Sequence, residues 1–341
     1  MPSADAEQSR QEGARGRTAL PEWLEPELAT LTKERFRDPA WIFERKLDGE
    51  RCLAYVASGG ETRLMSRNKH QITGTFPEIT RALAAQARED CVVDGEIVAF
   101  EGGQTRFERL QRRLGVGRPG EQLLTEVPVC YYLFDVLYAG GADLRPRPLR
   151  ERKEALRSAL SFDGPLRYTE HRDTDGVAYY HEACRDGWEG IIAKRADAPY
   201  RSGRTRDWLK FKCENGQEFV IGGFTDPQGS RSGFGALLLG YYDRDGQLVY
   251  AGKVGTGFDQ TLLHSLHQSM VALERSSPPF DRGVLPRSRA HWIEPRLVGQ
   301  VAFAEWTRDG QLRHPRFQGL RQDKDPGEVT REAPSGGRSA S

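Results

Sequence analysis

Hydrophobic residues recur along the chain with two different periods, and their order outlines a mixed α and β protein. Apolar or alternating runs predict strands at 41–44, 52–56, 62–67, 91–100, 129–138, 188–194 and 208–212. Apolar residues three and four positions apart predict helices at 76–87, 107–114, 149–160 and 176–185. The first two thirds of the chain therefore predict an α+β domain.

The pattern changes near residue 213, where short strands separated by glycine-rich turns begin. Strands are predicted at 218–224, 236–242, 248–254 and 300–307, and one helix at 260–273. Short strands with a single helix are typical of a small closed barrel, of which the OB-fold is a common nucleic-acid-binding form. We expect an α+β domain over 19–213 and an all-β barrel over 214–330. The polar ends, a leader at 1–18 and a tail at 331–341, are predicted to be disordered.

Composition narrows the possible classes of protein. The 341 residues carry 50 Lys and Arg against 49 Asp and Glu, which excludes a polycation and an acidic disordered chain but allows a local basic groove. No apolar run approaches the roughly 18 residues of a membrane span, so we expect a cytoplasmic protein without membrane association. The five cysteines form no CxxC pair, which predicts buried thiols and no zinc site.

Lysine is rare in this chain, with nine residues against 41 arginines. Arginine therefore serves wherever a generic cation is sufficient. Because a guanidinium stays protonated and cannot act as an amine nucleophile, each remaining lysine is a candidate for chemistry that arginine cannot perform.

The strongest single motif is the segment Glu44-Arg45-Lys46-Leu47-Asp48-Gly49-Glu50-Arg51. Its lysine follows a predicted strand, an Asp-Gly turn reverses the chain, and an arginine comes five residues later. This arrangement suits a nucleophilic amine at the edge of a cleft. A hairpin with exposed charges is the alternative explanation, and the short motif alone does not decide between them.

Other charged residues interrupt apolar runs. The carboxylates of Asp94, Glu96 and Glu189 lie in strand-like segments, where a buried charge needs a partner. A hard divalent cation that shares phosphate ligands is one solution, and salt bridges to arginines are another. Lys210 and Lys212 lie two residues apart and therefore on one face of a strand, where two ammonium groups suit a polyphosphate.

These segments occur in a family-like order: KxDGxR, SRN at 66–68, DGE, YYLFDVLY, EGIIAKR and WLKFK. Together they resemble the covalent nucleotidyltransferase superfamily of ATP-dependent DNA ligases, RNA ligases and mRNA capping enzymes. The later segments VIGGFTDPQGSRSGFGALLLGYYD, YAGKVGTGF and LRHPRFQGLRQDKDP are similar to the ligase component of the bacterial ligase D family. The resemblance, over about 21–329, implies an ATP-grasp-like adenylation (nucleotidyltransferase) domain followed by an OB-fold.

The resemblance also implies roles for particular residues. Lys46 would become linked to AMP, Glu44 would read the adenine edge, and Phe134 would stack on the adenine ring. Glu96 and Glu189 would lie near the catalytic metal. The other nucleotide-binding residues would hold the ribose, the phosphates and the leaving pyrophosphate: Arg51, Arg67, Glu96, Arg204, Lys210, Lys212, Arg321 and Lys324.

The implied activity is sealing of 5′-phosphate and 3′-hydroxyl ends in DNA through a lysyl-AMP intermediate, with ATP and Mg²⁺ or Mn²⁺. Nicked or broken duplex DNA would be the substrate, in double-strand break repair by non-homologous end joining. The implied partners are the end-binding protein Ku and separate polymerase and nuclease modules. We expect a monomer associated with the bacterial nucleoid.

Two other functions remain open at this stage. An RNA ligase or RNA guanylyltransferase would use the same lysine chemistry with another nucleotide or strand. An inactive OB-fold scaffold would bind nucleic acid without forming an adduct, although the intact Lys46 and the lysine cluster favour an enzyme.

Overall fold

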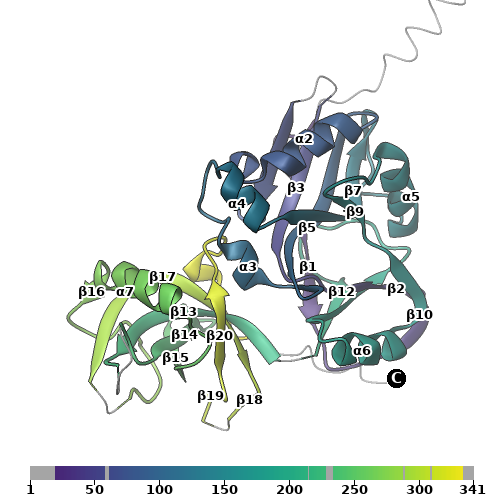
Figure 1. Cartoon of the computed structure of the whole chain (residues 1–341). Helices are drawn as coiled ribbons and strands as arrows, with labels where there is room; N and C mark the ends of the chain where they lie inside the picture. Colours follow the sequence, from purple (N-terminus) through teal and green to yellow (C-terminus); the bar gives the residue numbers. More distant parts are fainter. Residues whose placement is uncertain are drawn as a thin grey trace, which may run out of the picture. The chain divides into compact units, whose positions relative to one another are not determined.

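The computed structural model describes residues 20–57, 61–213, 215–227, 233–286, 289–307 and 309–332 (Figure 1). The leader expected at 1–18 and most of the tail expected at 331–341 lie outside these residues. The chain forms two compact units, an N-terminal unit that ends at Phe211 and a C-terminal unit that begins at Lys212. This division falls two residues before the boundary that we expected from the sequence.

Two sheets form the N-terminal unit, and residues 41–56 cross from one to the other. The first sheet has the order β4 (Thr62–Ser66), β3 (Glu50–Val56), β5 (Cys91–Glu101), β7 (Val129–Ala139), β8 (Ala142–Asp143), with β6 (Gln104–Thr105) on β5 and β9 (Leu166–Tyr168) on β7. The second has the order β1 (Glu27–Leu31), β12 (Gly203–Lys212), β11 (Gly190–Arg195), β2 (Arg37–Arg45), β10 (His171–Asp175). Because β2 lies in one sheet and β3 in the other, the segment between them joins the two sheets.

Helices cover these sheets, and two apolar cores hold the layers together. The helices of this unit are η1 (Thr73–Thr75), α2 (Pro77–Gln86), α3 (Phe107–Gln111), α4 (Glu121–Glu126), α5 (Leu149–Ala159) and α6 (Gly176–Arg185). One core packs α2, α3 and α5 on the first sheet, with Phe76, Phe107 and Leu156 fully buried or nearly so. Another contains Tyr55 and Phe134 from the first sheet and Trp208 from the second, so the sheets pack on each other at this point.

The C-terminal unit is mainly antiparallel and, in its described residues, contains one α-helix. Its main sheet has the order β15 (Leu248–Val254), β14 (Leu237–Tyr242), β13 (Asn215–Thr225), β17 (Ala290–Phe303), β16 (Glu274–Arg275), with β20 (Arg316–Leu320) on β17. The remaining elements are a hairpin of β18 (Glu305–Trp306) and β19 (Leu312–Arg313), the helix α7 (Gln260–Val271), and η2 (Pro326–Glu328). Phe219, Leu263 and Phe317 belong to the core that joins α7 to the sheet.

Most predicted elements are confirmed, and the errors have local causes. The helix predicted at 176–185 has the same bounds in the structure. The sequence analysis does not predict the strand β10, because its sequence HRDTD has no apolar residue. Its pairing with β2 defines it as a strand. The bounds predicted for the strand at 300–307 are wrong at both ends, since β17 begins at Ala290 and ends at Phe303, before a bend at Ala304.

The cysteines agree only in part with the expectation of thiols. Cys52 and Cys91 are buried free thiols, and burial raises the pKa of Cys91 to about 12. Cys130 is a half-buried free thiol, whereas Cys184 and Cys213 are disulfide-bonded, so the expectation is wrong for these two. Within the described residues, no helix has the length and apolar character needed to cross a membrane.

Candidate active site

Lys46 lies directly after β2, where the backbone keeps it beside β11. Its N–H donates to the carbonyl of Gly190 over 2.9 Å. Its Nζ lies 2.5 Å from Oε2 of Glu189, and the two side chains remain 19% and 26% exposed. The antiparallel pairing of β2 with β11 therefore brings together two residues that the sequence placed in the site and that are 143 positions apart.

The Asp-Gly turn after Lys46 is fixed by contacts with the first sheet. Asp48 accepts the N–H of Phe107 over 3.1 Å, and its own N–H donates to the hydroxyl of Thr105 over 3.2 Å. A Cβ at Gly49 would lie 2.2 Å from the carbonyl oxygen of Ile97, so only glycine fits here. The turn thus needs these residue types for packing as well as for reversal of the chain.

Arg51 is held in place by a buried carboxylate. Its Nε and Nη2 donate to the two oxygens of Asp94, both over 2.6 Å, and Asp94 is fully buried while the arginine side chain is 17% exposed. Tyr200 donates its hydroxyl to the same carboxylate over 2.6 Å. Burial alone would lower the pKa of Arg51, but the Asp94 carboxylate raises it above its ordinary value. The motif arginine is therefore a permanently charged, oriented group.

The two carboxylates predicted to lie near a metal occupy different elements. Glu96 is half-buried on β5, opposite Arg51 on β3, whereas Glu189 precedes β11 and pairs with Lys46. Arg67 follows β4 and is half-buried in the next turn. In the described parts of the chain, no group of three metal-ligating side chains occurs. Carboxylate oxygens are the type of ligand that a hard cation such as Mg²⁺ prefers.

Glu44 lies deep in the fold between two lysines. Lys153 of α5 donates to its Oε1, and Nζ of Lys194 on β11 lies 2.6 Å from its Oε2. Burial alone would raise the pKa of Glu44, but these two ammonium groups hold it below its ordinary value. The carboxylate two residues before Lys46 is therefore ionised although it is buried.

Phe134 forms an aromatic wall beside this cluster. Its ring packs edge-on against Trp208 with 5.9 Å between centroids. The guanidinium of Arg51 lies 4.6 Å from the ring centroid, and Nζ of Lys194 lies 4.1 Å from it. Phe134 is 7% exposed, and its contacts link Arg51 to Glu44 through Lys194.

The three cations predicted to bind phosphates all lie on β12 but in different surroundings. Arg204 is exposed and donates to the carbonyl of Ala29 over 2.7 Å. Lys210 is half-buried and pairs with Leu31 in the parallel register of β1. Lys212 belongs to the C-terminal unit, where its Nζ donates to the carbonyl of Gly216 and lies 3.3 Å from Glu332. Among these three, only Lys210 and Arg204 belong to the N-terminal unit with Lys46.

Arg321 and Lys324 form a second charged cluster in the C-terminal unit. Arg321 donates to both oxygens of Asp323, over 2.8 and 2.7 Å. Glu218 lies 3.4 Å from Lys324 and 3.7 Å from Arg321. Burial alone would raise the pKa of Asp323, but Arg321 and Lys324 hold it below its ordinary value.

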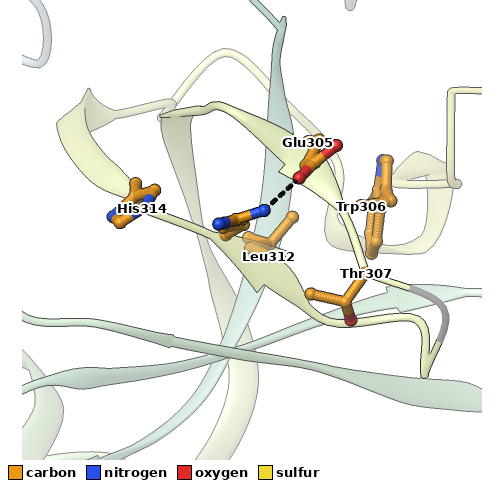
Figure 2. Close-up of a pocket in the computed structure, with 6 residues that line it drawn as sticks. Glu305, Trp306, Thr307, Leu312 and His314 are labelled. Carbon is orange, nitrogen blue, oxygen red and sulfur yellow. Dashed lines mark hydrogen bonds and ion pairs between the residues drawn. The ribbon is translucent and has the colours of Figure 1, made fainter.

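A surface hollow lies at the β18–β19 hairpin of the C-terminal unit (Figure 2). An ion pair of 2.6 Å between Arg313 and Glu305 crosses it. The hollow contains none of the residues that the sequence placed in the site, as its lining shows: Glu305, Trp306, Thr307, Leu312, Arg313 and His314. We therefore do not assign the nucleotide to it.

The sequence anticipates three polar residues that hold the site together only in part. For Asp94 it allows a salt bridge to an arginine without identifying Arg51, and nothing in the sequence analysis marks Tyr200. Lys153 is the third, and a signal for it was present. Lys153 is one of only nine lysines, and it lies in a helix that otherwise uses arginine.

Comparisons with known proteins agree with this arrangement. Residues 26–212 match the family model of the ATP dependent DNA ligase domain, and residues 230–324 match that of the ATP dependent DNA ligase C terminal region. A mycobacterial DNA ligase D complexed with ATP and MES has a similar structure, with 34% identity and a TM-score of 0.66. That match covers 91% of this chain and 98% of the other, and the expected fold class is confirmed.

Curated relatives are longer than this chain. The multifunctional non-homologous end joining protein LigD of Pseudomonas aeruginosa is 40% identical over 94% of this chain and 38% of its own length. The protein of the same name from Mycolicibacterium smegmatis is 35% identical over 93% of this chain and 41% of its own length. The chain thus spans about two fifths of the length of these relatives.

Proposed function

This chain belongs to the ATP-dependent DNA ligase family, and we propose that it joins a 5′-phosphate to a 3′-hydroxyl in duplex DNA through AMP bound to Lys46. The observation that carries the assignment is the pair of Lys46 and Glu189. The amine is fixed by its backbone and by one carboxylate, yet it keeps a fifth of its surface accessible. An anchored, partly accessible amine suits a nucleophile that must meet a substrate.

Three transfers make up the proposed reaction. The ammonium of Lys46 first gives up a proton to solvent, and the amine then attacks the α-phosphorus of ATP. An N–P bond forms, the bond from the α-phosphorus to the oxygen of the β-phosphate breaks, and pyrophosphate leaves. The 5′-phosphate of DNA then takes the AMP from Lys46 and frees the amine. Finally the 3′-hydroxyl attacks that 5′-phosphate, the phosphodiester forms, AMP leaves, and the hydroxyl proton goes to solvent.

Residues around Lys46 have the chemistry to bind the nucleotide. We assign the adenine to the wall of Phe134 and to the ionised Glu44, which lies on β2 two residues before Lys46. Arg51 and Arg67 are assigned to the ribose and neighbouring phosphate. The phosphates are assigned to Arg204, Lys210 and Lys212, and the leaving pyrophosphate to Arg321 and Lys324.

A divalent cation fits the carboxylates of this site. Glu96 and Glu189 would hold Mg²⁺ or Mn²⁺, which would neutralise charge on the phosphate oxygens during each transfer. The pairing of Glu189 with Lys46 supports this assignment, since a cation at Glu189 would release the amine from its salt bridge.

We further propose that the chain acts in non-homologous end joining, because the LigD relatives carry that name. Broken or nicked duplex DNA would be the substrate. Ku and separate polymerase and nuclease modules would be the partners, with the chain acting as a monomer on DNA in the cytoplasm.

The test is transfer of labelled AMP. Wild-type protein incubated with Mg²⁺ and ATP labelled at the α-phosphate is expected to become labelled and to pass the label to nicked DNA. Lys46→Arg keeps the charge but is expected to take no label, because guanidinium is not a nucleophile at neutral pH. Lys33→Arg, an exposed lysine, is the matched control and should behave as wild type. Labelling of folded Lys46→Arg at the wild-type rate would refute the assignment.

A further inference from the structure

One buried lysine has no part in the proposed reaction, although it contacts the site. Lys153 of α5 donates to Oε1 of Glu44, and Lys194 of β11 pairs with Oε2 of the same carboxylate. The three side chains are each 2% exposed. One carboxylate thus has two ammonium partners inside the fold.

Lys153 is anchored independently of Glu44. Its Nζ also donates to the carbonyl of Thr169 over 3.0 Å and lies 4.8 Å from the ring centroid of Tyr168. The helix α5 uses arginine at its other basic positions, 150, 152 and 157, so this ammonium is an exception in its surroundings. The anchors fix the ammonium in front of Oε1 of Glu44.

The electrostatic effect of Lys153 falls on the charge state of Glu44. A lone carboxylate in a buried position tends to take up a proton, because burial penalises its charged form. Lys153 opposes this tendency at Oε1 and Lys194 opposes it at Oε2, since each ammonium attracts the charge and bonds to it. Without Lys153, a single ammonium would remain to hold the carboxylate ionised.

The charge state of Glu44 decides which hydrogen bonds it can make. An ionised carboxylate only accepts, whereas a protonated one can also donate. Adenine presents an amino donor at its 6-position, and guanine presents an oxygen acceptor there. An ionised Glu44 therefore favours a 6-aminopurine, and a protonated Glu44 would accommodate a 6-oxopurine.

We propose that Lys153 is a specificity-determining positioning residue, which holds Glu44 as an ionised acceptor and thereby makes the adenylation step select ATP over GTP. The inference rests on the proposed function, because it takes Glu44 to face the purine edge. Lys153 acts through Glu44 and does not touch the nucleotide.

Lys153→Met tests the proposal by removing the charge at a similar volume. The rates of adduct formation with ATP and with GTP are measured from about pH 6 to pH 8. In wild type, the preference for ATP should stay constant over this range. In Lys153→Met it should fall about tenfold or more at the acidic end and recover as the pH rises, because Glu44 loses its proton again.

Two controls separate this effect from loss of structure. Arg150→Met removes another cation of α5, whose exposed side chain pairs with Asp173 over 2.6 Å, and should leave the preference unchanged. Lys153→Arg keeps the charge and should keep the preference even where it lowers the melting temperature. A lower melting temperature of Lys153→Met with an unchanged preference at every pH would overturn the proposal.

A second variant covers the case in which Lys153→Met does not fold. The double variant Lys153→Met/Glu44→Gln removes one charge of each sign and leaves an amide that can donate or accept. It should lose the preference at all pH values, and retention of the wild-type preference would overturn the proposal. Failure of the proposed function has a different signature, since wild type would then form no adduct with either nucleotide.

Discussion

The two charged clusters differ in where the partner of the shortest ion pair lies along the chain. In the N-terminal unit, the key pairs join different strands or a strand and a helix: Lys46 with Glu189, Arg51 with Asp94, and Glu44 with Lys153. In the C-terminal unit, Arg321 donates two hydrogen bonds to Asp323, two residues away, and Glu218 of β13 lies at the longer distances of 3.7 Å from Arg321 and 3.4 Å from Lys324.

The difference separates short ion pairs that join distant segments from a cluster whose shortest pair lies within one loop. Loss of a partner in the first sheet would leave a buried charge uncompensated, which is costly. The side chains of Arg321 and Lys324 are both 11% exposed and lie after the last strand of their sheet. The ion pair of Lys324 with Glu218 is longer, at 3.4 Å, than the 2.6 Å pair of Arg51 with Asp94, so removal of Lys324 should cost less stability than loss of Asp94.

Asp94→Asn should have the largest effect on stability. The substitution removes the charge that compensates Arg51, and breaking such a buried pair costs about 3–5 kcal/mol. Urea denaturation measures this loss. The control is Glu182→Gln, which breaks an exposed pair with Arg172 and should cost about 0–1 kcal/mol. Equal small losses in both variants would contradict the structural role of Asp94.

Lys324→Ala should cost less stability than Asp94→Asn and should damage one chemical step. If Lys324 stabilises the leaving pyrophosphate, adduct formation should slow about 100-fold. Sealing of a nick that already carries AMP should stay near wild type, because no pyrophosphate forms there. The two steps are measured separately on folded protein, with Arg313→Ala of the exposed pair with Glu305 as control. Equal losses in adduct formation and in nick sealing would show that Lys324 has a structural role and no role in pyrophosphate release.

Trp188→Leu should have a smaller effect on the first step. Trp188 precedes Glu189, and its ring stacks under the guanidinium of Arg45, which precedes Lys46, at 4.5 Å. Loss of this stack loosens the two strand ends, and we expect adduct formation to slow about tenfold.

The control for Trp188 lies on the same pair of strands. Trp41 of β2 contacts Arg195 of β11 at 6.0 Å, away from Lys46. Trp41→Leu should lower the melting temperature without slowing adduct formation in the protein that remains folded. If the two variants slow the reaction equally, the stack beside Lys46 has no special role.

Sequence patterns predicted the elements of the site better than its electrostatics. The lysine after a strand, the Asp-Gly turn and the EGIIAKR strand are local features, and the structure brings Lys46 and Glu189 together. The charge partners are not local. Asp94 and Lys153 are 43 and 109 positions from the residues that they hold, so no spacing rule connects them.

The rarity of lysine in the sequence is the signal that marks Lys153, the partner of Glu44. The chain has 41 arginines, and a lysine at position 153 of an arginine-rich helix is therefore unusual. This composition does not indicate that the partner is Glu44. The polar strand β10 shows the same limit for the fold, because pairing with β2 defines it and no apolar period does.

The site of AMP attachment tests the central claim most directly. Wild-type protein is incubated with ATP and Mg²⁺, digested, and its peptides are analysed by mass spectrometry. We predict that AMP is bound to the peptide that contains Lys46, and that the modification disappears when free ATP is removed and nicked DNA is then added. AMP on another lysine, or no AMP on any peptide of active protein, would contradict the account.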